Sequence, residues 1–216
     1  MLSEAYPRLY HMAEADSWDS IQRYGLLSTT ALLDRFEYAG AERERIESQR
    51  RSKNVVIEHP EYGRAVIRDN IPMRERALEQ CLQGYTPREW YELLNRRVFF
   101  WLSRERLFRL LRAREYRRKR QTILTVNTER LLQRHAARVS LSAINSGATL
   151  YTPQPRGVDT FRSIEDYPIG YWRRKRSWKD AVVELTVDYN IPDIRDLTLR
   201  VEHVEGGETV EVLWER

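Results

Sequence analysis

The stretch VVELTV at residues 182–187 constrains the fold most, because β-branched and aliphatic residues at a two-residue period need a sheet to pack in. One face of this predicted strand is aliphatic and is expected in the core: Val183, Leu185 and Val187. The opposite face is mixed: Val182, Glu184 and Thr186. Two interpretations of Glu184 stay open. Either it faces water at one side of an antiparallel sheet, or it is a catalytic carboxylate in a cleft that Val182 and Thr186 also line.

The composition favours a globular protein with a phosphate-bearing partner. At 216 residues the chain is long enough for a substantial core, and we expect a single domain over residues 1–216. A hydrophobic fraction of 41% argues against disorder, and 32% charged residues indicate a densely charged surface. The net charge is +5, and arginine far outnumbers lysine. Because the guanidinium fork suits phosphate oxygens, a nucleotide or nucleic-acid partner is favoured.

Several chemistries are excluded by what the chain lacks. Cys81 is the only cysteine, which rules out an internal disulfide and a thiolate zinc cluster, and the four histidines lack metal-ligand spacing. No metal site is therefore expected. The glycine-rich phosphate loop, the dinucleotide fingerprint, the nucleophile elbow and the HExxH motif do not occur. The N-terminus has no export signal, and the densest apolar run, residues 98–102, is too short to span a bilayer, so we expect a cytoplasmic protein without membrane contact.

The beginning of the chain reads as one strand followed by helices. A strand at residues 8–12 leads into a short helix that Gly25 ends. Ser28 or Thr29 can cap the helix that follows. Residues 40–53 are charged all round and predict either a solvated helix or a mobile loop.

The middle of the chain carries the strongest local signals. The sequence TPRE combines a capping box with proline at the first helical position, which predicts a helix over residues 87–95. RVFFW at residues 97–101 predicts a buried strand, and Ser103 can cap an amphipathic helix that runs into a basic segment ending at Arg120. A mainly helical insertion is expected at about residues 54–96.

The second half is richer in strands. QTILTVN at residues 121–127 alternates as a strand does, and a helical pattern follows it. Residues 141–166 are rich in Ser, Gly, Pro and Thr and predict a long, partly ordered loop. The end of the chain predicts a β-hairpin with Gly206 and Gly207 at its turn. Helices early and strands late indicate an α+β fold.

Two basic clusters contain aromatic residues. One lies at residues 112–120 and includes Arg118 and Arg120. The other, YWRRKRSW, brings an aromatic ring beside four cations: Trp172, Arg173, Arg174, Lys175 and Arg176. Cations pair with phosphates and aromatic rings stack on unpaired bases, so this mixture is typical of a single-strand nucleic-acid binder. The alternatives are a solvated helix end for the first cluster and an exposed loop for the second.

Several motifs, taken in order, resemble one enzyme family. In LYHMAEADSWDSIQRYGLLS, Tyr10 and His11 are followed by an acidic loop, a short helix and Gly-Leu. This order resembles the opening of ADP-ribosyltransferase-like proteins of the DarT type, and the chain is also similar to a related uncharacterised bacterial group. RVFFWLSRERL resembles that family's internal aromatic strand. VVELTVDYNIP resembles the strand of its catalytic glutamate, with Pro192 eight residues after Glu184. RIESQRR is similar to a segment that supplies an NAD-contacting arginine, here Arg51 or, as the competing choice, Arg50.

The resemblance implies split antiparallel sheets, helices in the N-terminal half, and NAD as substrate. Glu184 would stabilise the oxocarbenium-like cation that forms when the bond between nicotinamide and ribose breaks. Arg51 would pair with the pyrophosphate, and His11 would hydrogen-bond a ribose. Tyr10 and Trp101 would flank the nicotinamide. The loop around Trp172 would present the acceptor.

The implied function is an NAD-dependent ADP-ribosyltransferase, a glycosyltransferase of toxin or phage-defence type that modifies DNA or RNA and has an antitoxin protein as a further partner. Two alternatives stay open: an NAD glycohydrolase or RNA phosphotransferase on the same fold, and a non-catalytic nucleic-acid-binding protein. The chain departs from the family pattern in the insertion at residues 54–96 and in the polar loop INSGATLYTPQPRG. These departures bear on the acceptor more than on the NAD site.

Overall fold

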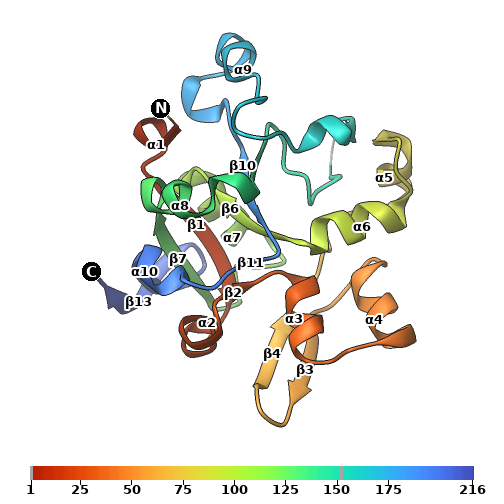
Figure 1. Ribbon diagram of the computed structural model, residues 1–216, viewed down its shortest axis with the longest axis vertical. Helices are drawn as coiled ribbons and strands as arrows, with labels where there is room; N and C mark the ends of the chain where they lie inside the picture. Colours follow the sequence, from red (N-terminus) through yellow and green to blue (C-terminus); the bar gives the residue numbers. More distant parts are fainter. Residues whose placement is uncertain (1, 151–152) are drawn as a thin grey trace.

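A seven-stranded antiparallel sheet forms the centre of the protein, as a computed structural model that describes residues 2–150 and 153–216 shows (Figure 1). Its strand order is β13-β12-β7-β1-β6-β10-β8. In chain order the strands are β1 (Arg8–Glu14), β6 (Arg97–Trp101), β7 (Gln121–Asn127), β8 (Val139–Ser142), β10 (Glu184–Asp188), β12 (Thr198–Glu205) and β13 (Glu208–Glu215). The chain is therefore α+β with a large antiparallel sheet, as expected.

The sheet consists of two halves that meet at one residue pair. β1 pairs with β7 along its whole length, and β6 pairs with β10 along its whole length. Between β1 and β6, in contrast, the ladder holds only Tyr10 opposite Trp101. The two strands diverge beyond this pair. Backbone N–H and C=O groups of β6 that face β1 there have no partner on β1, so side chains can hydrogen-bond to them.

Helices and short strands surround the sheet. The α-helices are α1 (Leu2–Ala5), α2 (Trp18–Tyr24), α3 (Thr29–Arg35), α4 (Gly40–Glu47), α5 (Glu75–Cys81), α6 (Pro87–Asn95), α7 (Arg104–Leu111), α8 (Thr128–His135), α9 (Ile169–Lys175) and α10 (Ile194–Leu197). The 3₁₀-helices are η1 (Ala136–Arg138), η2 (Val158–Thr160) and η3 (Trp178–Asp180). The short strands are β2 (Leu26–Leu27), β3 (Val55–His59), β4 (Gly63–Ile67), β5 (Leu82–Gln83), β9 (Arg156–Gly157) and β11 (Asn190–Ile191). In Figure 1, α9 lies at one end of the molecule, and α3, α4 and the β3–β4 hairpin lie toward the other.

Both faces of the sheet are covered by apolar residues. On one face, Leu185 and Val187 of β10 belong to the main core cluster with residues of α2, α8 and α10. On the other face, the apolar stripe of α7 packs on β7 and β12, with Leu107 against Ile123 and Val204. The prediction of a core face for β10 is confirmed. The idea that its mixed face meets water is wrong, because β10 lies between β6 and β8 and both of its faces are buried.

The strongest local predictions are confirmed because local chemistry decides them. Helix α6 has the expected bounds, and Thr86 and Glu89 form the capping box. Ser28 and Ser103 cap α3 and α7, each by accepting a backbone N–H. The C-terminal hairpin turns at Gly206 and Gly207, whose φ values of 62° and 81° favour glycine. Residues 40–47 form the helix α4.

Two predictions need correction, and a third, the partly ordered loop, is confirmed. The insertion at residues 54–96 is not mainly helical at its start, because β3 and β4 form a hairpin before α5 and α6. Valine and isoleucine on these strands favour that pairing. YWRRKRSW is not an exposed loop, because its first five residues lie in α9 and its last residue, Trp178, begins η3. Within the loop expected at residues 141–166, β9 and η2 are ordered elements, and residues 151 and 152 lie outside the described residues. That residues 1–216 form one domain stays a prediction.

Gly25 connects two of the sequence motifs in space. It follows α2 with φ 86° and ψ 170°, a backbone conformation that is essentially restricted to glycine. Directly after it, β2 pairs with β11. A Cβ atom on Gly25 would lie 2.8 Å from Cα of Pro192 and 2.9 Å from the carbonyl oxygen of Ile191. The Gly-Leu and Ile-Pro pairs of the sequence therefore pack directly on each other.

Replacing Gly25 by alanine is expected to lower the free energy of unfolding by about 2 kcal/mol or more, because it adds a backbone clash to the strained dihedral angles. Urea denaturation measures the change. Gly147→Ala is the matched control, since its φ is not positive and its added Cβ would meet only Asn145 Oδ1, at 3.8 Å. An equal, small effect in both variants would contradict this account of Gly25.

Within the described residues, no helix has the length and apolar character needed to cross a membrane.

Candidate functional site

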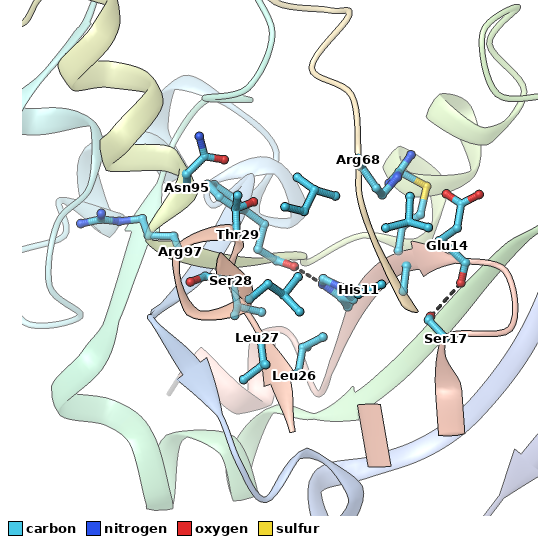
Figure 2. A pocket seen from close by; sticks show the side chains of 18 of the residues that line it. His11, Glu14, Ser17, Leu26, Leu27, Ser28, Thr29, Arg68, Asn95 and Arg97 are labelled. Atoms are coloured by element: carbon cyan, nitrogen blue, oxygen red, sulfur yellow. Dashed lines mark hydrogen bonds between the residues drawn. The ribbon is translucent and has the colours of Figure 1, made fainter. Parts of the chain in front are cut away.

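A cavity of about 500 Å³ lies where the two halves of the sheet diverge (Figure 2). Its wall includes His11 from β1, Phe99 and Trp101 from β6, and Glu184 from β10. The wall also includes the segment from α2 to α3, β4 and the residues after it, part of α6, and Asn145, Gly147 and Ala148. Four predicted site residues from distant parts of the chain thus line one cavity: His11, Arg51, Trp101 and Glu184.

Glu184 is the first residue of β10 and is held in place by two neighbouring strands. In the ladder it lies opposite Trp101 on one side and Ser142 on the other. Its Oε2 atom accepts hydrogen bonds from the Ser146 hydroxyl at 2.7 Å and from the Ser146 backbone N–H at 3.1 Å. The side chain is buried, at 5% exposure. Burial raises the pKa of Glu184 to about 7, and the Ser146 hydrogen bonds and the charge of Arg156 oppose this rise.

The loop that carries Ser146 is positioned by Arg156, which is itself buried. The Arg156 guanidinium donates to the carbonyl oxygens of Ala148 at 3.0 Å, Ser146 at 3.4 Å and Gln154 at 3.2 Å. Sequence reasoning missed both Ser146 and Arg156. Both lie in the polar loop that was taken only as a departure from the family pattern. The sequence holds no signal for Ser146, because it comes near Glu184 only when β8 pairs with β10 and places Ser142, four residues earlier, opposite Glu184.

The two-residue period of the strand does not predict which neighbours of Glu184 line the cavity. Val182 and Thr186 were predicted to line the same cleft as Glu184, but neither contributes to the wall. Both side chains are fully buried, Val182 in the main core and Thr186 in the middle of β10. Only Glu184, at the start of the strand, reaches the cavity. Because both faces of this strand are covered, its residues are buried whichever face they point to.

His11 bridges the gap between the two halves of the sheet. Its Nδ1 atom lies 2.8 Å from the carbonyl oxygen of Phe99, the hydrogen bond drawn in Figure 2. Burial lowers the pKa of His11 to about 4, so the ring is neutral at physiological pH. Because the partner is a carbonyl, Nδ1 carries the proton and donates it. Nε2 is then a hydrogen-bond acceptor.

Tyr10 was predicted to flank the nicotinamide beside Trp101, but it lies outside the cavity wall. Neighbouring residues of a strand point to opposite faces, so Tyr10 and His11 cannot face the same way. Tyr10 packs instead against the apolar cluster of α7, together with Met12. Trp101 contacts the same cluster and also lines the cavity.

Arg51 lines the cavity, but its guanidinium is used within the protein. It donates to the carbonyl oxygens of Ile46 and Arg68 and, at 3.0 Å, to Asn95 Oδ1. Burial lowers the pKa of Arg51 to about 10. The side chain thereby joins the end of α4 to the end of β4 and to α6. The geometry is that of a structural clamp rather than of a phosphate ligand.

Arg50, the competing choice, is not part of the cavity wall. Its guanidinium donates to the carbonyl oxygens of Met73 at 2.6 Å and Ile71 at 3.2 Å. Neither candidate arginine therefore offers a free fork to a ligand. Sequence similarity selects a position, whereas the partners of a guanidinium depend on which carbonyl groups the fold brings near it.

Of the two basic clusters, the one at residues 112–120 reaches the cavity wall, through Tyr116, and the one on α9 does not. Arg173, Arg174 and Lys175 on α9 are exposed, and no residue of α9 belongs to the cavity wall. Trp172 packs partly against the main core, and the Arg176 guanidinium lies 4.4 Å from the centre of its ring. Their predicted role beside the activated sugar lacks support. In the other cluster, Arg118 and Arg120 are exposed, and Tyr116 borders the cavity.

Residues 7–198 match DUF7002, which is described as a family of unknown function. The chain belongs to this family. A search of curated proteins finds no match. The DUF7002 region contains His11, Trp101, Ser146, Arg156 and Glu184, so the whole arrangement around the cavity falls within the family match. Within the described residues, no group of three or more His, Cys, Asp or Glu side chains is placed to hold a metal ion.

Proposed function

We propose that this protein is an NAD-dependent ADP-ribosyltransferase in which Glu184 is the catalytic carboxylate. The observation that carries the proposal is the placement of Glu184. It is buried in the wall of a cavity shared with His11 and Trp101, and Ser146 fixes its carboxylate. Rigid placement of a negative charge at a cavity wall is what electrostatic stabilisation of a cationic transition state requires.

The sheet architecture also supports the proposal. An ADP-ribosyltransferase-like fold has two antiparallel sheets that split beside the NAD site. Here the two halves of the sheet are joined only at Tyr10 and Trp101, and the cavity lies at this junction. His11 and Glu184 come from opposite halves. This arrangement favours a ligand that lies across the junction.

The proposed reaction transfers ADP-ribose from NAD to an acceptor. The bond between nicotinamide nitrogen and ribose C1 breaks, and its electron pair leaves with nicotinamide. The ribose then carries oxocarbenium character, which ionised Glu184 stabilises. A nitrogen or oxygen atom of the acceptor forms the new bond to C1 and loses its proton. His11 Nε2, as an acceptor, suits a ribose hydroxyl.

A nucleic acid is the proposed acceptor class. The basic segment at residues 112–120 borders the cavity through Tyr116, and exposed cations such as Arg118 lie in the same segment. Phosphates that pair with this segment would bring a base toward Glu184. The α9 cluster lies outside the cavity wall, so its cations would contact more distant phosphates. An antitoxin partner and a cytoplasmic location stay predictions.

The test measures nicotinamide release from NAD labelled in the nicotinamide ring, in separate incubations without acceptor, with DNA, with RNA and with protein. The proposal predicts release that increases with a nucleic acid and labels that nucleic acid when the label is in the adenosine part. Release that no acceptor increases would indicate an NAD glycohydrolase. Nucleic-acid binding that weakens with salt, without any NAD cleavage, would support the non-catalytic binder and contradict the proposal.

A further inference from the structure

Arg68 is a half-buried cation of the cavity wall, and within the described residues its guanidinium donates to no oxygen atom. It follows β4 and contributes to the cavity wall, and Figure 2 shows it beside Glu14 on one side of His11. Its Nε atom is buried and has no hydrogen-bond partner within residues 2–150 and 153–216. In the same part of the chain its guanidinium forms no ion pair, and it lies 5.4 Å from the centre of the Tyr116 ring.

The other arginines of the cavity wall are paired with protein oxygens, packed on aromatic rings or exposed to water. Arg51 donates to three protein oxygens, as described above. Arg97 donates to the Leu93 carbonyl oxygen at 2.9 Å and lies 3.7 Å from a carboxylate oxygen of Asp188. Arg35 lies 5.2 Å and 5.3 Å from the ring centres of Tyr24 and Tyr62. Arg64 is exposed, so water can solvate it. Arg68 thus differs from the others because its Nε atom is buried without a partner and, within the described residues, no other nitrogen of its guanidinium has an oxygen partner.

The carboxylates near Arg68 are already used. Asp69 accepts hydrogen bonds from the Ile71 backbone N–H at 3.2 Å and the Tyr116 hydroxyl at 3.3 Å, and it lies 3.8 Å from Lys119 Nζ. Glu14 accepts from Asn54 Nδ2 at 3.1 Å. Burial lowers the pKa of the Arg68 guanidinium, although the negative charges around it act in the opposite direction. The buried Nε–H of Arg68 without an acceptor is unfavourable, and an anionic ligand that accepts from this N–H would remove the cost.

We infer that Arg68, and not Arg51, binds the diphosphate group of the ligand in this cavity. The identity of the ligand as a dinucleotide rests on the proposed function, whereas the anion site rests on Arg68 itself. A guanidinium fork matches two phosphate oxygens. Neutral His11 adds no competing charge and remains available for a ribose. The cavity of about 500 Å³ falls within the range of small-molecule sites, about 300 to 1,000 Å³.

Isothermal titration calorimetry of ADP-ribose, NAD and inorganic pyrophosphate tests this inference on the wild-type protein, Arg68→Gln and Arg68→Lys. Arg68→Gln is expected to weaken ADP-ribose binding about 10- to 100-fold, because the charge-assisted hydrogen bonds to the diphosphate are lost. Arg68→Lys keeps the charge but loses the fork, and an intermediate weakening of at least about 3-fold is expected. Pyrophosphate shows whether the anion alone suffices, and ADP-ribose adds the nucleoside.

Arg76→Gln is the control, because it removes one positive charge at an exposed position outside the cavity wall. It is expected to change ADP-ribose affinity less than about 3-fold. Equal affinity in the wild-type protein and Arg68→Gln would overturn the inference. If Arg68→Gln does not fold, an ADP-ribose affinity of Arg68→Lys equal to that of the wild-type protein would overturn the inference. Binding of none of the three ligands to the wild-type protein would also overturn it. Arg68-dependent binding of ADP-ribose without nicotinamide release would sustain the inference and contradict the proposed transferase.

Discussion

Glu184→Gln is expected to lower the rate of nicotinamide release about 100- to 1,000-fold, because it removes the negative charge that stabilises the ribose cation. Glutamine keeps the shape and an oxygen that accepts from Ser146, so the cavity should stay intact. The rate in the wild-type protein should rise with pH through about 7, the pKa of Glu184, because the ionised form is the active one. Release measured from pH 5 to 9 checks both expectations.

The same variant is expected to become more stable than the wild-type protein at high pH. The pKa of Glu184 is about 7 in the folded protein, against 4.5 as its ordinary value. Between these values the folded state binds more protons than the unfolded state, so stability falls as pH rises through this window. Above pH 7 the buried charge costs roughly 3 kcal/mol, and Glu184→Gln removes that cost.

Urea denaturation at pH 5 and pH 8 measures this effect, with Glu208→Gln as a control at an exposed position. Glu184→Gln should lose less stability between the two pH values than either the wild-type protein or the control. Unchanged nicotinamide release in Glu184→Gln would contradict its catalytic role. Identical pH dependence of stability in all three proteins would contradict the buried, raised-pKa carboxyl.

Arg51→Met is expected to lower the free energy of unfolding by about 3 kcal/mol, since it leaves the buried acceptors of Arg51 without donors. These acceptors are the carbonyl oxygens of Ile46 and Arg68 and the side-chain oxygen of Asn95. They belong to three different elements, so the clamp as a whole is lost. Chemical denaturation followed by tryptophan fluorescence measures the change.

Arg50→Met is the matched control, because Arg50 also donates to two carbonyl oxygens but is itself exposed, whereas Arg51 is half-buried. It should cost about 1 kcal/mol, the typical net contribution of such hydrogen bonds. A stable Arg51→Met variant that has lost NAD binding would contradict the clamp and restore Arg51 as the phosphate ligand.

The local elements were predictable because their causes lie within a few residues. The capping box of α6 joins Thr86 to Glu89, and the hairpin turn depends on Gly206 and Gly207. The prediction of an α+β fold needed only the order of such elements. The insertion was predicted less well, because the pairing of β3 with β4 competed with the charged, helix-like composition around it.

The candidate site was predictable only in part, and the reason is physical. The sequence alone placed His11, Trp101 and Glu184 in strands and, by resemblance, in one site. Only the tertiary structure decided that Tyr10 faces α7, that Ser146 holds Glu184, and that Arg68 rather than Arg51 has no oxygen partner within the described residues. The period of a strand sets the side on which a residue lies. The hydrogen-bond partners and the burial of a charged group are set by residues far away in the chain, as between Arg51 and Asn95 or Ser146 and Glu184. These long-range contacts exist only once the chain has folded.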